Sequence, residues 1–119
     1  MSGNEIVLAP GSGKPLTRSL LDKNNQPVDF ATGTWRADLS IIEYPDVDAP
    51  VFAKLSSVSE SGSLQWLVLN NDSSVTITPD PEVTSLWDFY KYHYELFVTG
   101  PNAQSKTERV DHGPLRLDK

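Results

Sequence analysis

Alternation of apolar and polar residues marks the two clearest strands that the sequence predicts. Apolar residues occupy every second position in residues 34–43 and again in residues 91–99, with mostly polar residues between them. Successive side chains of a strand point to opposite faces of its sheet, so each segment predicts a strand with one face turned to a core. The predicted core-facing residues are Trp35, Ala37, Leu39 and Ile41 in the first strand and Tyr92, Tyr94, Leu96 and Val98 in the second.

Shorter apolar or β-branched runs, separated by turn residues, predict the remaining strands. The dense apolar run at residues 64–69 predicts a central strand. The one helical candidate is residues 78–87, where Asp80 can cap a helix that begins at Pro81. The other predicted strands are residues 16–22, 51–58 and 75–78. A final segment, residues 105–111 and then Leu115 and Leu117, can pair with the strand at residues 91–99 as a last hairpin.

The number and spacing of these elements predict the fold class. Seven to eight short strands and one short helical turn near residues 80–87 are typical of an all-β, antiparallel β-sandwich, either immunoglobulin-like or jelly-roll-like. We expect a single β-sandwich domain over residues 15–119, preceded by a flexible N-terminal arm over residues 1–14. Within that arm, Ile6, Val7 and Leu8 can form either a short edge strand or a docking arm.

Composition and charge narrow the classes of partner. The 119 residues carry a formal net charge of −6, and residues 29–95 hold eleven acids but only three bases. A nucleic acid or an anionic membrane surface requires a basic footprint, so we expect neither as a partner. No apolar run approaches the ~20 residues of a membrane-spanning helix. The N-terminus lacks the pattern of a secretion signal, so none is expected.

Few residues suggest catalytic or metal chemistry. The chain has no cysteine and only two histidines, His93 and His112. Asp111 precedes His112, and adjacent strand residues point to opposite faces, which disfavours a catalytic dyad. Asp46 and Asp48 offer too few oxygen ligands to specify a calcium site. We therefore predict a protein that is not an enzyme, with no catalytic residue, no cofactor and no metal.

Aromatic residues gather in residues 87–94. Such residues more often fill a sandwich core or mark the corner where a strand enters it, but exposed aromatic rings can also stack on sugar rings. If this segment makes a surface contact, Trp87, Phe89 and Tyr90 are the candidates. A carbohydrate site would require exposed, coplanar tryptophan or tyrosine side chains beside Asp or Asn. The tryptophans are Trp35, Trp66 and Trp87.

The order of turns and strands carries a family resemblance. A proline-containing turn, Asp-Lys-Asn-Asn-Gln-Pro-Val-Asp-Phe, covers residues 22–30, and Thr-Gly-Thr at residues 32–34 opens the long alternating strand. The tyrosine-rich strand at residues 87–96 and the closing segments up to residue 117 complete the pattern. In these features residues 16–118 resemble a family of small β-sandwich domains in the tail and baseplate proteins of tailed bacteriophages. Asn25 stands where the family turn has glycine, and Trp87 or Asp88 stands where glycine precedes the tyrosine strand.

The resemblance implies a structural virion component, assembled in the host cytoplasm. The expected function is that of a tail or baseplate accessory protein, which acts through assembly contacts with other virion tail proteins. A homo-oligomer would fit the symmetry of tail organelles. Two alternatives stay open: a carbohydrate- or host-surface-binding β-sandwich module, and a head–tail connector component. The candidate assembly contacts are Ile6, Val7, Leu8, Trp87, Phe89 and Tyr90.

Overall fold

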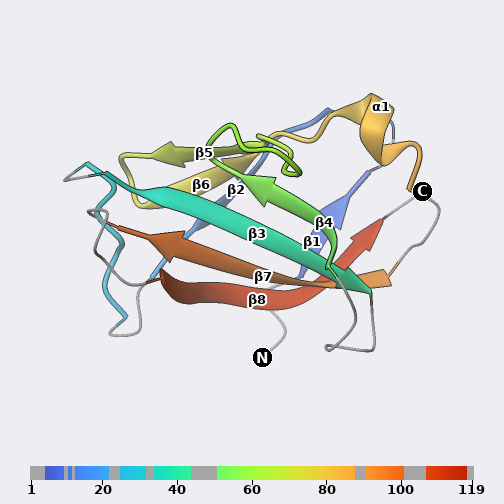
Figure 1. The fold of residues 1–119 in the computed structure, drawn as a ribbon. Helices are drawn as coiled ribbons and strands as arrows, with labels where there is room; N and C mark the ends of the chain where they lie inside the picture. The colour runs from blue at the N-terminus through green and yellow to red at the C-terminus, as the bar shows by residue number, and fades with distance from the viewer. Residues whose placement is uncertain are drawn as a thin grey trace.

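Two β-sheets packed face to face build the molecule (Figure 1). The computed structural model describes residues 5–9, 11, 13–21, 25–31, 34–43, 51–87, 91–100 and 107–117. Within them, eight strands and one short helix confirm the predicted all-β sandwich. The five-stranded sheet has the order β1 (Ile6–Leu8), β8 (Thr107–Leu117), β7 (Lys91–Thr99), β3 (Arg36–Glu43) and β4 (Val51–Ser56); the three-stranded sheet has the order β2 (Leu16–Ser19), β6 (Ser74–Ile77) and β5 (Leu67–Asn70).

The core lies between the two sheets and uses the alternating faces that the sequence predicts. Every predicted core-facing residue of β7 is buried, and so are those of β3 from Ala37 onward, while Trp35 packs against this core half-buried. The smaller sheet contributes Leu67, Val75 and Ile77 from its inner face. Because an apolar side chain contributes about 1.5–3 kcal/mol on full burial, this shared core is the main force that holds the sheets together.

The helical turn α1 (Pro81–Thr84) forms where the capping signals predict it, although it is shorter than expected. The carboxylate of Asp80 accepts a hydrogen bond from the backbone N–H of Glu82 at 2.9 Å. Pro81 occupies the start of the helix, where its missing N–H costs nothing. Thr84 is fully buried and ties the turn to the N-terminal segment, since its Oγ1 accepts a hydrogen bond from Gly11 N at 3.4 Å.

The strand that we predicted as central, β5, lies at the edge of the smaller sheet. Within the apolar run, only residues 67–69 belong to β5, which pairs with β6 over residues 67–70. Leu64 instead bonds to β4 of the other sheet: its N–H donates to Lys54 O at 2.8 Å, and its C=O accepts from Ser56 N at 2.9 Å. The apolar run therefore links the two sheets before it enters one of them. The final segment forms one strand, β8, which pairs antiparallel with β7 as the predicted last hairpin, with a register shift between Leu96 and Phe97.

The N-terminal apolar stretch forms an edge strand, one of the two alternatives that the sequence leaves open. β1 runs parallel to β8, with Ile6 opposite Leu115 and Leu8 opposite Leu117. Ile6 and Leu8 are buried in the core, and Val7 between them is half-buried. Residues 6–8 therefore belong to the sandwich, which corrects the expected separation of residues 1–14 as an arm.

Candidate functional site

Trp87, one of the predicted surface contacts, is a core residue. Its side chain is 8% exposed and stacks on Trp66 with ring centroids 5.7 Å apart. Phe52 of β4 packs edge-on against it at 5.3 Å. This burial corrects the interpretation of Trp87 as a surface contact. It also shows that Trp66 and Trp87 do not present exposed rings on which a sugar could stack. The other aromatic candidates, Phe89 and Tyr90, lie outside the described residues, as do Asp46 and Asp48.

Val7 and Leu8, two other predicted contacts, line an apolar groove between edge strands of the two sheets. β1 ends the five-stranded sheet and β2 ends the three-stranded one, so each has one sheet neighbour within the described part of the chain. The groove has a volume of about 220 Å³. Ile6 is buried in the core and is not part of the described lining. We call this the β1–β2 groove; its described lining is Val7, Leu8, Ala9, Lys14, Pro15, Leu16 and Pro79.

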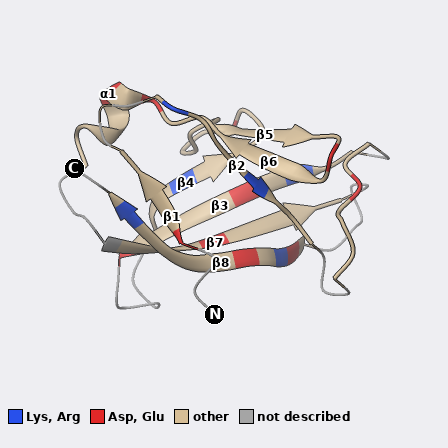
Figure 2. Ribbon diagram, turned by 180° about the vertical axis from the view of Figure 1, so that it is seen from behind, with Lys and Arg blue, Asp and Glu red and all other residues tan. Residues whose placement is uncertain are grey.

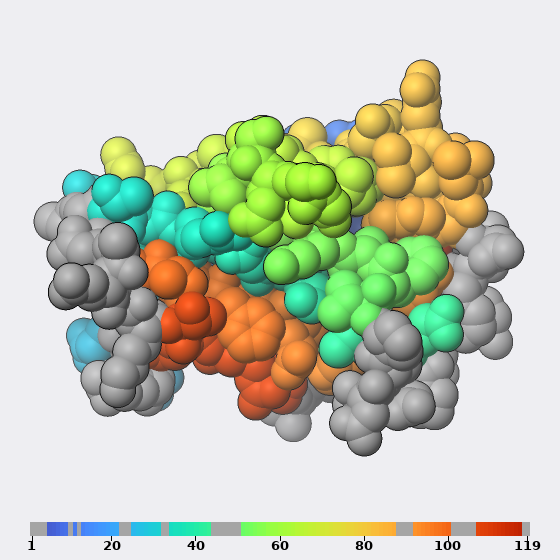
Figure 3. Space-filling view, viewed as in Figure 1, coloured from blue at the N-terminus to red at the C-terminus, as the bar shows by residue number. Residues whose placement is uncertain are grey.

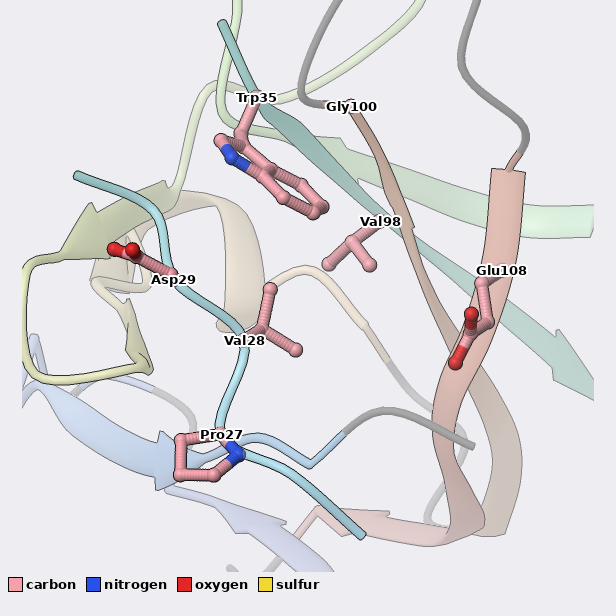
Figure 4. Close-up of a pocket in the computed structure, with 7 residues that line it drawn as sticks. All are labelled: Pro27, Val28, Asp29, Trp35, Val98, Gly100 and Glu108. Carbon is pink, nitrogen blue, oxygen red and sulfur yellow. The ribbon is translucent and has the colours of Figure 1, made fainter. Parts of the chain in front are cut away.

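A second cavity, the Trp35 pocket, lies at the start of β3 and has a volume of about 310 Å³ (Figure 4). The six-membered ring of Trp35 points between Val28 and Val98. Gly100 lies over the face of this indole. A Cβ at Gly100 would lie 2.6 Å from Cδ2 of Trp35. Because Cδ2 joins the two rings, another atom can come so close to it only from above the ring plane. The described lining is Pro27, Val28, Asp29, Trp35, Val98, Gly100 and Glu108.

Among its described lining residues, the Trp35 pocket has two carboxylate side chains, Asp29 and Glu108. Asp29 lines its rim, but its Oδ1 accepts the backbone N–H of Ala31 at 3.0 Å, which fixes a local turn. Phe30 packs edge-on against Trp35 at 5.5 Å. With Gly100 on its face and Phe30 beside it, the half-buried indole is a packing residue and not an open platform for a flat ligand.

A polar cluster joins the two sheets beside the core. Arg18 of β2 reaches across to Asp111 of β8, with Nη2 and Oδ2 3.0 Å apart. The Tyr94 hydroxyl donates to the same carboxylate oxygen at 2.9 Å and accepts from Arg18 Nη2 at 3.2 Å. Burial, and then the hydrogen bond to Asp111, raise the pKa of Tyr94 well above its ordinary value, so the hydroxyl stays protonated as a donor. We call this group the inter-sheet cluster.

The two histidines do not complete a catalytic arrangement with Asp111. The Asp111 carboxylate faces the inter-sheet cluster, whereas His112 is exposed and lies opposite Glu95 in the register of β7 and β8. His93 and His112 lie with their ring centroids 6.2 Å apart. Within the described residues, no group of three or more metal-ligating side chains comes together. Acidic and basic positions intermingle on the ribbon and form no basic stripe in the part of the chain that Figure 2 colours.

Comparisons with protein-family models, with curated proteins and with solved structures return no match to this chain. The resemblance to phage-tail domains therefore stays a prediction from the sequence. Among the described residues, no helix has the length and apolar character needed to cross a membrane.

Proposed function

We propose that this chain is a non-enzymatic structural protein that acts through assembly contacts with other proteins, as a component of a bacteriophage tail or baseplate. The observation that carries the assembly part is the β1–β2 groove, where two edge strands border one apolar recess. An edge strand presents backbone N–H and C=O groups that can pair with a neighbouring chain. The virion setting rests on the resemblance of the turn and strand motifs alone.

The composition of the groove favours a limited contact over open-ended strand addition. Pro15 and Pro79 line the groove, and proline has no backbone N–H to donate to an added strand. Lys14 places a charge beside them, which is a further common protection of sheet edges. A partner segment can therefore pair along β1 or β2 for only a few residues, which suits a defined assembly contact.

The test is the solution mass of the full chain, measured by light scattering over a concentration series. Val7→Lys places a charge in the groove without touching the buried Ile6 and Leu8, so it should reduce the mass to that of a monomer. Val68→Lys is the matched control: it is also on an edge strand, and Val68 is 54% exposed on β5, away from the groove. A wild-type monomer at every concentration, or equal effects of both substitutions, would contradict self-assembly through this groove.

A further inference from the structure

The outer face of the five-stranded sheet carries an open groove, separate from the β1–β2 groove and the Trp35 pocket. Its volume is about 490 Å³, within the range of ligand sites. The side chains of β3, β7 and β8 form adjoining bands on the face turned to the viewer in Figure 3. We call this the outer-face groove; its described lining is Arg36, Asp38, Ser40, Lys54, Phe97, Thr99 and Thr107.

An aromatic ring stands in this groove between two ion pairs. Strand register places half-buried Phe97 of β7 between Asp38 of β3 and Arg109 of β8. Asp38 is held by Arg36 through two hydrogen bonds of 2.8 and 2.7 Å, and Arg109 is held by Glu95 at 2.8 Å. The ring is therefore bordered on both sides by charged groups that already have partners.

The charges around the groove balance. Arg36 also bonds Glu60 at 3.0 Å, and its two carboxylate partners raise the pKa of its guanidinium further above its ordinary value. The charged residues that line the groove, together with their ion-pair partners and the neighbouring Arg109–Glu95 pair, number three basic and three acidic side chains. The basic ones are Arg36, Lys54 and Arg109, and the acidic ones are Asp38, Glu60 and Glu95. A charged ligand would gain little net attraction here, whereas a neutral ligand with many hydroxyl groups meets fixed donors and acceptors.

Hydroxyl groups complete the lining. The Thr99 and Thr107 hydroxyl oxygens lie 2.8 Å apart in a hydrogen bond across β7 and β8, and Ser40 lies on the β3 side, opposite Lys54 in register. We propose that the outer-face groove binds a neutral saccharide, with one sugar ring stacked on Phe97 and its hydroxyl groups bonded to the flanking polar side chains. Aromatic faces attract the C–H face of a sugar while hydroxyls and carboxylates bond its edge.

The test is an amide NMR titration of the isotope-labelled full chain with free gluco-, manno- and chito-oligosaccharides. We expect at least one of them to shift the amide signals of Ser40, Phe97 and Thr99. Phe97→Ala should weaken that binding by roughly tenfold or more, because it removes the stacking surface. Val68→Ala, which removes an exposed apolar side chain from the other sheet, should leave the affinity unchanged.

A second variant separates stacking from simple apolar contact. Phe97→Leu keeps an apolar side chain but removes the ring, so it should weaken binding about as much as Phe97→Ala. Full affinity in Phe97→Leu would contradict the stacking role. The proposal is overturned if no oligosaccharide of the panel shifts the groove amides. It is also overturned if only a sulfated oligosaccharide binds and Lys54→Ala abolishes that binding, because the groove would then be an anion site.

Discussion

Removal of Arg18 tests whether the inter-sheet cluster helps to hold the sandwich together. Arg18→Met keeps most of the apolar stem of the side chain but removes the cation that faces Asp111. The side chains of Arg18 and Asp111 are 18% and 11% exposed. Without Arg18, the carboxylate would stay largely out of water, and the Tyr94 hydroxyl would still donate a hydrogen bond to it.

The expected cost lies between two measured limits. Exposed ion pairs contribute about 0.2–1 kcal/mol, while breaking a fully buried pair costs about 3–5 kcal/mol. Because Arg18 and Asp111 are mostly but not fully buried, we expect Arg18→Met to lower the free energy of unfolding by about 2 kcal/mol. Urea denaturation measures this change directly, provided that the slope with denaturant is unchanged.

A second arginine of the same fold supplies the control. Arg116 reaches Glu5 at 3.9 Å, and their side chains are 49% and 40% exposed, so Arg116→Met should cost less than about 0.5 kcal/mol. Asp111→Asn should recover part of the loss in the Arg18→Met background, because it removes the uncompensated charge. Equal small costs for both arginine substitutions would refute the reasoning.

Three further predictions concern the packing of the core and the raised pKa of Tyr94. Gly100→Ala should lower the free energy of unfolding by about 1–3 kcal/mol and change the Trp35 fluorescence, because its Cβ would lie 2.6 Å from the indole. The control is Gly13→Ala, whose Cβ would lie 3.4 Å from its nearest atom and which should cost less than about 0.5 kcal/mol. Equal costs for the two substitutions would contradict the contact. Tyr94 has a raised pKa, so the folded state keeps its proton where the unfolded chain releases it. Its contribution is complete below a pH of about 10 and is lost as the pH rises above that value. Tyr94→Phe should therefore show a shallower alkaline loss of stability in denaturation series at rising pH, and an unchanged slope would contradict the shift. Trp87→Ala should cost about 3–5 kcal/mol by the same denaturation assay, as expected of a core aromatic; a cost below about 1 kcal/mol would indicate a surface position.

The sequence predicts those elements of the fold that depend on local patterns of residues. The alternation in residues 34–43 and 91–99 identifies β3 and β7 and their buried faces, because side-chain direction in a strand has a period of two. The Asp80–Pro81 signal likewise locates α1 through local hydrogen bonding. These elements form the centre of the larger sheet and the helical turn α1.

Features that depend on distant residues are not visible in the sequence. The parallel pairing of β1 with β8 joins opposite ends of the chain, and nothing in Ile6–Leu8 specifies that partner. β8 also continues through Pro114, directly before Leu115, where β1 joins. Arg18 and Asp111 meet across 93 positions. The outer-face groove was missed for the same reason, although the placement of Phe97 on the polar face of its strand was a signal that could have pointed to it.

Hydrogen exchange at low and high protein concentration tests the assembly proposal most directly, since it reports where a contact forms. If a second copy pairs with the β1–β2 groove, amide protection at Ile6–Leu8 and Leu16–Ser19 should rise with concentration, while that of Leu67–Asn70 on β5 stays constant. Protection that is independent of concentration throughout, or that rises only at β5, would contradict assembly through this groove.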